Sequence, residues 1–363
     1  RNTTMKKISR RSFLTCAAAG IAMAGLSACG SAPAASSAAS AAASSAAASG
    51  AASVNSSASG KVMMYSSMQE DQLVAIKAAF EKKYPSVQME YYFAGTSKVI
   101  TKIATEAQAG QVDADVIWVG DPADYVSFKE ENILQPYTST EVDAIDPAFV
   151  DPEGYYTGAR MMNMGIGYNT TMVKPEEAPQ SWTELLDEKW KGQIVMTDPG
   201  SSGTSKYWMN ALMCSTSYGS DYMQKLKDNG CFLESGTTAC HNQLAACAYK
   251  VGVCIDYVTA NLAAEGSPLG FVYPTDTVSI FSPLGLVANC ANADNGKLLY
   301  DFILSKEGQE VLIANNLISV RTDVDQGATD VAGIAKKALA TDLTTMASKA
   351  EENLAAFDAI YGI

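Results

Sequence analysis

Several chemically important residue types are scarce or missing. Histidine occurs once in 363 residues, at position 241, and no cysteines have the Cys-x-x-Cys spacing of structural zinc sites. No Gly-x-Ser-x-Gly stretch is present, so the nucleophile elbow of the α/β hydrolases is missing. A Ser-His-Asp triad would have to use His241, which follows Cys240 in a cysteine-rich segment. We therefore expect no catalytic residues, no resident metal, no cofactor and no enzymatic activity.

Positive charge and long apolar runs are also in short supply. The chain has 26 Lys and Arg against 39 Asp and Glu, a net charge of −13. Binding to nucleic acid needs a basic footprint, so a nucleic-acid partner is not expected. The apolar stretch at 13–28 is shorter than the about 20 residues that a membrane-spanning helix needs, and it is rich in Ala and Gly.

The N-terminal segment has the features of an export signal. Basic residues follow Met5, the expected start, and precede the apolar stretch. Ser9-Arg10-Arg11-Ser12-Phe13-Leu14 resembles the twin-arginine motif, and an ordinary secretory signal is the alternative. Leu26-Ser27-Ala28-Cys29 resembles a bacterial lipobox. We expect a signal peptide at 1–29 and lipidation of Cys29, which would hold the protein on the outer face of the cytoplasmic membrane.

The segment that follows differs sharply from the rest of the chain. Residues 31–60 are almost entirely Ala and Ser, without aromatic or charged side chains. Such a segment cannot bury a core, so 30–60 is expected to be a disordered tether. The remaining 300 or so residues exceed what one core usually serves, which favours two lobes. Six cysteines lie in this part, and both disulfides and buried free thiols stay open.

Strands and helices alternate after residue 60. Strand patterns cover 61–65, 87–93 and 114–119, with helical patterns at 72–83 and 98–109 between them. This order predicts a parallel sheet with helices on both faces and a ligand beyond the carboxyl ends of the strands. Further strands are expected at 161–168, 194–197, 251–256 and 284–289, and further helices at 181–189, 205–214, 257–264, 295–315 and 341–361.

Short blocks along the chain resemble one protein family. The blocks are Tyr65-Ser66-Ser67, Ala114-Asp115-Val116-Ile117-Trp118, Tyr168-Asn169, Lys191-Gly192-Gln193-Ile194, Val272-Tyr273-Pro274 and the DFxLSxEGQ-like segment from Asp301 to Gln309. Together they resemble the iron/thiamine/phosphonate-type solute-binding proteins of ABC importers over roughly 61–320. The resemblance implies a two-lobed α/β fold of the type II periplasmic binding proteins, with helices on both faces of parallel-rich sheets and a hinge. It also implies a monomer that delivers a small ligand to an ABC permease.

The chain crosses between the expected lobes at least twice. We assign 61–160 plus 278–363 to lobe one and 161–277 to lobe two. A hinge of this kind closes around a ligand.

The strongest candidate for ligand contact is the turn Asp198-Pro199-Gly200-Ser201-Ser202-Gly203-Thr204, between a strand and a helix. Free N–H groups at a helix N-terminus attract anions, and Ser202, Gly203 and Thr204 add hydroxyl donors and close backbone approach. A plain helix cap is the alternative. Similar turns in lobe one contain four further candidates, Ser66, Ser67, Thr96 and Ser97.

Four other residues complete the predicted site. Arg160 could hold an oxyanion in a bidentate contact, or form an interlobe salt bridge. Asp256 and Asp276 could accept from a ligand amine or hydroxyl, although turn or cap roles are equally open. Tyr257 could pack on an apolar part of the ligand. We expect an anionic organic solute such as a phosphonate, a phosphate ester or a carboxylate.

Ferric iron is the main alternative ligand. Within the resembling family, iron binders present adjacent tyrosines after the strand that here reads 251–255, and this chain has Asp256-Tyr257 instead. An iron site would have to use Tyr65, Tyr257 and Asp256, because phenolate and carboxylate oxygens suit Fe³⁺. Thiamine or a polyamine is a third possibility.

Overall fold

The computed structural model describes residues 58–363. The predicted signal peptide, Cys29 and nearly all of the expected tether lie outside the described residues. Within the described part, no helix combines the length and apolar character needed to cross a membrane. All six cysteines between 58 and 363 are free thiols.

Ten strands form one continuous sheet. They are β1 (Gly60–Ser66), β2 (Val87–Phe93), β3 (Val116–Trp118), β4 (Leu134–Gln135), β5 (Tyr156–Asn169), β6 (Ile194–Thr197), β7 (Phe232–Glu234), β8 (Val251–Ile255), β9 (Leu269–Val272) and β10 (Val278–Val287). The main path runs β2-β1-β3-β10-β5-β8-β6-β7. β1 is parallel to β2 and β3, and β6 is parallel to β7 and β8, whereas β5 and β10 are antiparallel to their neighbours.

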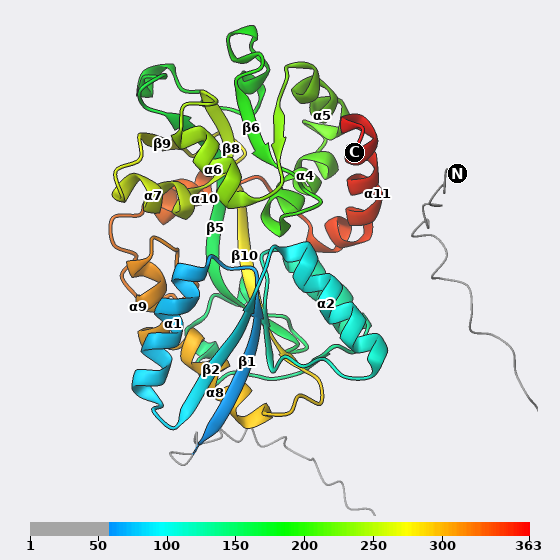
Figure 1. The fold of residues 1–363 in the computed structure, drawn as a ribbon, viewed down its shortest axis with the longest axis vertical. Coiled ribbons are helices and arrows are strands. Elements are labelled where there is room, and N and C mark those ends of the chain that lie inside the picture. Colours follow the sequence, from blue (N-terminus) through cyan, green and yellow to red (C-terminus); the bar gives the residue numbers. More distant parts are fainter. Residues whose placement is uncertain (1–57) are drawn as a thin grey trace, which may run out of the picture. The chain divides into compact units, whose positions relative to one another are not determined.

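The two long strands β5 and β10 divide this sheet into halves. One end of β5 pairs with β10, and its other end, from Met164 to Tyr168, pairs with β8. Figure 1 shows β1 and β2 at one end of this pair and β6 and β8 at the other. The strands of each half are mostly buried, which explains their apolar composition. β5 and β10 are therefore the connections about which the halves can bend.

The α-helices flank the strands of both halves (Figure 1). They are α1 (Glu70–Lys83), α2 (Thr96–Ala109), α3 (Pro122–Glu130), α4 (Gly203–Cys214), α5 (Gly219–Asp228), α6 (Thr237–Ala245), α7 (Asp256–Ala264), α8 (Ala293–Leu304), α9 (Lys306–Ala314), α10 (Val331–Lys337) and α11 (Leu343–Tyr361). The last helix packs on α4 and α5, where Asn210 Nδ2 donates to the Met346 carbonyl at 2.7 Å and Lys227 Nζ donates to that of Ile360.

Three of the predicted elements differ from the structure. Residues 181–189 form two short 3₁₀ helices, Thr183–Leu186 and Glu188–Trp190, because Asp187 between them is extended. The helix expected at 295–315 is two helices, since Ser305 is extended and its hydroxyl caps α9 by accepting from the Gly308 N–H. The strand expected at 284–289 is the second part of β10.

Candidate functional site

A small cleft lies where the two halves of the sheet face each other. Its volume is about 230 Å³, below the roughly 300–1,000 Å³ of pockets for drug-sized ligands. The lining residues are Ser67, Gln69, Phe93, Gly95, Thr96, Ser97, Lys98, Ser201, Ser202, Ser235, Gly236, Thr237 and Thr238. They come from four turns, which follow β1, β2, β6 and β7. The cleft thus lies beyond the carboxyl ends of parallel strands, as the strand order predicts.

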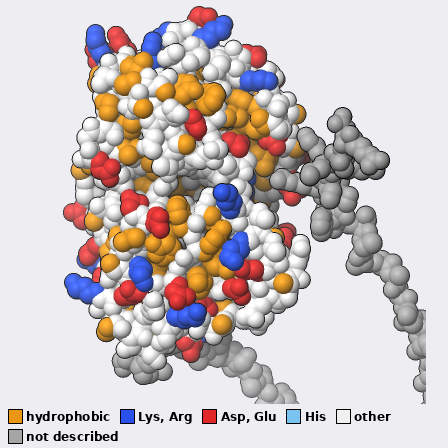
Figure 2. All heavy atoms as spheres, in the orientation of Figure 1, with side chains coloured by type: hydrophobic (Ala, Val, Ile, Leu, Met, Phe, Trp, Pro, Cys, Tyr) orange, Lys and Arg blue, Asp and Glu red, His pale blue; other side chains and the backbone are white. Residues whose placement is uncertain are grey.

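The cleft is suited to a negatively charged ligand. Among the described residues no Asp or Glu lines it, although the whole chain carries 39 of them, and Lys98 is the one charged residue there that does. The helices α2, α4 and α6 all begin at the cleft, with Gly95, Ser202 and Gly236 as their N-caps. Each N-terminus presents unpaired backbone N–H groups and the positive end of a helix dipole. In Figure 2 the surface between the two halves is mostly white, the colour of the backbone and of side chains that are neither hydrophobic nor charged.

The turn before α4 supplies the most concentrated set of donors. Ser202 Oγ accepts from the Ser205 N–H at 3.5 Å, so it does cap the helix. The same oxygen lies 3.1 Å from Thr204 Oγ1 and 3.4 Å from Thr237 Oγ1. Three hydroxyl groups from two helix N-termini therefore meet at one point. The structure brings Ser202 and Thr204 together and adds Thr237. Of the predicted Ser202, Gly203 and Thr204, only Ser202 lines the cleft, and Gly203 and Thr204 lie behind it.

The two sides of the cleft are close together. A Cβ placed on Gly203 would lie 2.9 Å from Thr96 Oγ1, and one on Gly95 would lie 3.2 Å from the Ser201 carbonyl oxygen. Thr238 Oγ1 also donates to Gln69 Oε1 at 3.3 Å across the cleft. Such contacts between turns of different halves define a closed arrangement. Only glycine fits at position 203 without moving a neighbour.

The four candidates from lobe one are placed differently from one another. Ser67, Thr96 and Ser97 line the cleft. Ser66 is fully buried, donates to the Trp118 carbonyl at 2.8 Å and accepts from the Met68 N–H at 3.1 Å. Its hydroxyl is thus occupied by the turn itself and does not line the cleft.

Arg160 lies on β5 in a buried layer and not in the cleft wall. Its Nη1 donates to Gln72 Oε1 at 3.3 Å, and its guanidinium lies 5.3 Å from the Trp118 ring and 5.7 Å from the Tyr257 ring. Burial lowers the pKa of Arg160, and Tyr257 opposes that effect. Arg160 Nε and Gln72 Nε2 have no partner among the described residues. No carboxylate in this part of the chain forms an ion pair with Arg160, so the interlobe salt bridge considered above is not formed.

The two candidate aspartates also have internal partners. Asp256 accepts from the Asn163 side chain at 2.7 Å and from the Tyr257 N–H at 2.8 Å. Burial raises the pKa of Asp256 to about 6, and the bonds from Asn163 limit the rise. Asp276 accepts from the Tyr218 hydroxyl at 2.8 Å and does not line the cleft.

The residues proposed for iron do not form a common set of ligands. The Tyr65 hydroxyl donates to Glu106 at 3.0 Å, and Lys102 lies over its ring. Burial raises the pKa of Tyr65 to about 12. Tyr257 instead lies beside the Arg160 guanidinium, a cation that opposes binding of Fe³⁺.

One cluster with metal-ligand side chains exists elsewhere in the described part. The ligand atoms of Cys240, His241 and Cys254 lie within 4.8 Å of one another. However, His241 Nε2 accepts from the Ile255 N–H at 3.1 Å, and Nδ1 lies 2.8 Å from the Thr237 carbonyl. Both ring nitrogens are therefore occupied, and a metal would leave a buried N–H without a partner.

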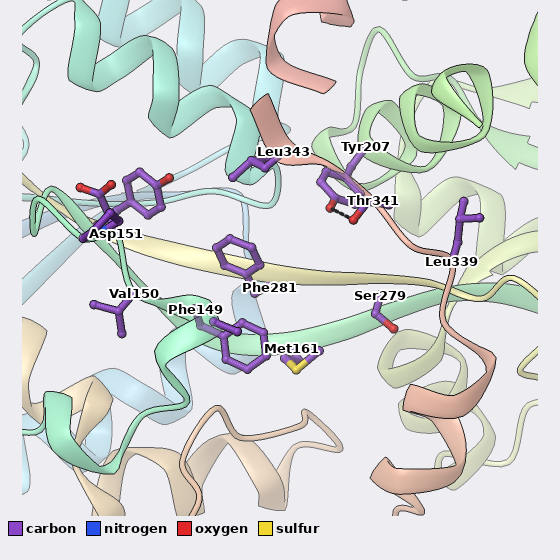
Figure 3. A pocket seen from close by; sticks show the side chains of 13 residues that line it. Phe149, Val150, Asp151, Met161, Tyr207, Ser279, Phe281, Leu339, Thr341 and Leu343 are labelled. Atoms are coloured by element: carbon purple, nitrogen blue, oxygen red, sulfur yellow. Dashed lines mark hydrogen bonds between the residues drawn. The ribbon is translucent and has the colours of Figure 1, made fainter. Parts of the chain in front are cut away.

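A larger cavity of about 360 Å³ lies along β5 and β10. Figure 3 shows Met161 and Phe281 of these strands beside Phe149, together with Tyr207 and Thr341, whose hydroxyls lie 3.3 Å apart. Aromatic and aliphatic side chains dominate its wall. It lacks the converging donors of the cleft, so the cleft is the better candidate for a solute.

The cleft contains residues that the sequence analysis missed or set aside. The residues that the sequence analysis did not propose as ligand contacts are Gln69, Phe93, Lys98 and the turn 235–238. The signal that could have found them is position, since they lie at or within a few residues of the ends of β1, β2 and β7, which end at the same edge of the sheet as β6.

The fold and cleft are those of a type II periplasmic binding protein. The chain belongs to the bacterial extracellular solute-binding proteins, whose family model matches residues 114–344. Members of this family are transport components that hold a small solute outside the cytoplasmic membrane for an ABC permease. This membership confirms the resemblance drawn from the sequence blocks and the predicted fold class.

Individual relatives span several ligands. The chain is 28% identical over 272 residues to an uncharacterized protein of Haemophilus influenzae, covering 71% of this chain and 77% of that protein. It is 27% identical over 242 residues to a putative 2-aminoethylphosphonate-binding periplasmic protein of Salmonella typhimurium, covering 62% and 67%.

Solved structures give the same architecture. The periplasmic binding protein AfuA of Actinobacillus pleuropneumoniae, with fructose-6-phosphate bound, has a TM-score of 0.76 and 26% identity, over 84% of this chain and all of that one. Iron-bound HitA of Pseudomonas aeruginosa has a TM-score of 0.73 at 16% identity, over 83% and 99%, which supports the fold alone.

Proposed function

We propose that this protein captures a small solute with a phosphonate or phosphate-ester group for an ABC importer. The observation that carries the proposal is the convergence of three helix N-termini on a cleft that Ser and Thr hydroxyl groups line and that no described carboxylate lines, with the Ser202 and Thr237 hydroxyls 3.4 Å apart. Phosphoryl oxygens need several N–H and O–H donors at once, and helix N-termini supply them. A carboxylated solute fits the same chemistry less fully, because it offers only two oxygens.

The relatives support the same class of ligand. Two proteins share about a quarter of their residues with this chain: one is named a putative 2-aminoethylphosphonate-binding protein, and the structure of the other, AfuA, has exogenous fructose-6-phosphate bound. Both solutes have a phosphoryl group and differ in the rest of the molecule. The rest of the ligand would face Phe93 and Gln69, the aromatic and amide side chains of the cleft.

We propose Ser67, Thr96, Ser97 and Ser202 as ligand contacts, with Thr204 holding the Ser202 hydroxyl in place and Gly203 allowing the close approach of the two sides. A buried layer behind the cleft contains Arg160, Asp256 and Tyr257. Arg160 donates to Gln72, which lies one turn of α1 from the cleft residue Gln69. From there the guanidinium adds positive potential without touching the solute. Ser66 and Asp276 are left out of the proposed contacts because internal hydrogen bonds occupy them.

Ferric iron is the competing ligand, and a phenolate site would have to use Tyr257. Thermal-shift measurements on the purified protein with phosphonates, sugar phosphates, carboxylates, thiamine and ferric citrate separate the possibilities. A ligand at 100 times its Kd adds about 2.7 kcal/mol of stability. We expect the phosphoryl compounds to raise the midpoint. A visible charge-transfer band with ferric citrate that disappears in Tyr257→Phe would refute the proposal.

We also propose that Cys29 carries the lipid that anchors this monomeric protein beside its permease. Cell fractionation tests the anchor: the wild-type protein should stay with membranes, and Cys29→Ala should be released. Equal membrane retention of both would contradict the anchor without affecting the ligand proposal.

A further inference from the structure

A buried ion cluster joins the two halves of the molecule next to the cleft. Lys206, in the first turn of α4, has its Nζ 3.1 Å from Asp121 Oδ2 and 2.5 Å from Asp124 Oδ1. The two aspartates are at the start of α3, in the half that contains β3, whereas α4 follows β6 in the other half. The side chains are 16%, 1% and 12% exposed. This cluster, Asp121–Asp124–Lys206, therefore spans the closing surface.

The cluster is joined through α4 to the turn that precedes this helix, residues 198–204. Lys206 lies on the helix whose N-terminal residues are Gly203 and Thr204. A Cβ on Gly203 would lie 3.3 Å from the Asp121 backbone nitrogen, and one on Gly120 would lie 3.2 Å from Thr204 Cγ2. Asp121 also caps α3 by accepting from the Ala123 N–H at 2.9 Å, which fixes its carboxylate. The ion contacts thus set how closely the first turn of α4 approaches the opposite side of the cleft.

Given the proposed solute-capture function, we propose that Asp121, Asp124 and Lys206 form a latch that holds the two halves closed and positions the first turn of α4 for ligand binding. Opening would separate the lysine from both carboxylates and return all three to water. In the closed arrangement the ions lie in a poorly solvated site, where their attraction is stronger than at the surface. The latch acts on closure itself, whichever solute the cleft takes.

The latch also makes closure depend on pH. Two carboxylates face one lysine, and Glu131 and Glu351 line the adjoining cavity with Asp124. Asp124 Oδ2 is buried without a hydrogen-bond partner among the described residues. Burial raises the pKa of Asp124 to about 7 in the closed arrangement, Lys206 opposes the rise and Asp121 adds to it. A carboxylate that is exposed on opening regains its ordinary pKa, so closure takes up a proton at Asp124 and is favoured as the pH falls through 7. Above that pH the charged form of Asp124 opposes closure, and the attraction between Lys206 and Asp121 holds the latch.

Hydrogen–deuterium exchange of the full-length protein without solute tests the latch. Lys206→Met should increase exchange several-fold in the cleft turns 67–72 and 235–240, which do not touch the latch but become exposed when the halves part. Lys129→Met is the matched control, because Lys129 also lies between two carboxylates, Asp151 at 3.4 Å and Glu153 at 2.5 Å, within one half. It should leave those turns unchanged.

Two outcomes would overturn the latch: unchanged exchange of these turns in Lys206→Met, or an equal increase in Lys129→Met. Asp124→Asn keeps a side chain of the same size but removes the carboxyl group that takes up a proton on closure. In the wild type, lowering the pH from 8 to 6 should slow hydrogen exchange in the cleft turns, after correction for intrinsic exchange. In Asp124→Asn this slowing should be lost. Persistence of the slowing in this variant would refute the role of Asp124. Because no solute is present, these results are independent of whether the ligand is a phosphoryl compound.

Discussion

Replacing Gly203 by alanine should weaken ligand binding while leaving the fold intact. The new Cβ would lie 2.9 Å from Thr96 Oγ1, 3.0 Å from Thr96 Cγ2 and 3.3 Å from the Asp121 backbone nitrogen, all across the cleft. Thr96 is only 5% exposed, so its side chain has little room to move away. Overpacking of this kind costs about 1–3 kcal/mol. If the cost falls on the closed state alone, affinity drops by roughly 5- to 150-fold.

Without solute the variant can relieve the contact by opening, so the free energy of unfolding should fall by less than the binding free energy does; alanine also favours the helix over glycine at the start of α4. Gly236→Ala is the matched control: Gly236, like Gly203, lies at the start of a helix beside the cleft, its φ is −171°, and no described atom lies within 4 Å of an added Cβ. Calorimetric titration with the solute found in the thermal-shift screen gives the affinities. Equal affinity of Gly203→Ala and wild type would show that the ligand-bound form does not bring Gly203 against Thr96, and would refute the reasoning.

Three further outcomes follow from other contacts. Ser202→Ala combined with Thr204→Ala should weaken binding more than tenfold by removing two clustered hydroxyls, whereas unchanged affinity by calorimetry would exclude the anion site. Gly308→Ala should lower the free energy of unfolding by about 3 kcal/mol, measured by urea denaturation, because its Cβ would lie 2.1 Å from the Phe302 carbonyl oxygen; a loss below 1 kcal/mol would contradict that packing. Burial lowers the pKa of His241, so the stability that the neutral imidazole contributes is present above the unfolded pKa of about 6.5 and is lost as the pH falls. His241→Gln should therefore flatten the decline of the urea midpoint between pH 7.5 and pH 5. A decline equal to that of the wild type would assign the pH dependence to other groups.

Local sequence patterns were sufficient for the elements that begin the fold. The apolar run 61–65 and the helical spacing of Leu73, Ile76 and Phe80 correspond to β1 and α1, whose inward faces are fully buried. The strand 87–93 has the predicted bounds. These elements bury strongly apolar faces, so periodicity alone determines them.

Short elements that are stabilised by contacts with distant parts of the chain could not be predicted from local sequence patterns. The helix α3 has no clear apolar periodicity, and its Tyr125 hydroxyl donates to the carbonyl of Pro283, far along the chain. The helix break at Ser305 depends on Gly308 packing against the end of α8. Tertiary contacts of this kind override local propensity.

The candidate site was predicted in part for a related reason. Turns that follow parallel strands could be ordered along the chain, and this located the turn before α4, whose Ser202 lines the cleft. Whether a hydroxyl faces the cleft or its own turn depends on side-chain geometry, which separates Ser67 from Ser66 although the two are neighbours. The pairing of Thr237 with Ser202 joins helices 35 positions apart and has no signal in either segment.

The most direct test of a phosphoryl-binding cleft is a calorimetric titration with paired solutes that differ only in that group. Fructose-6-phosphate is compared with fructose, and 2-aminoethylphosphonate with ethanolamine. The structure predicts saturable one-to-one binding of at least one phosphorylated or phosphonate member, no binding of its partner, and more than tenfold weaker binding in the Ser202→Ala, Thr204→Ala variant. Binding of ferric citrate alone, or of the neutral and cationic partners in preference, would contradict it.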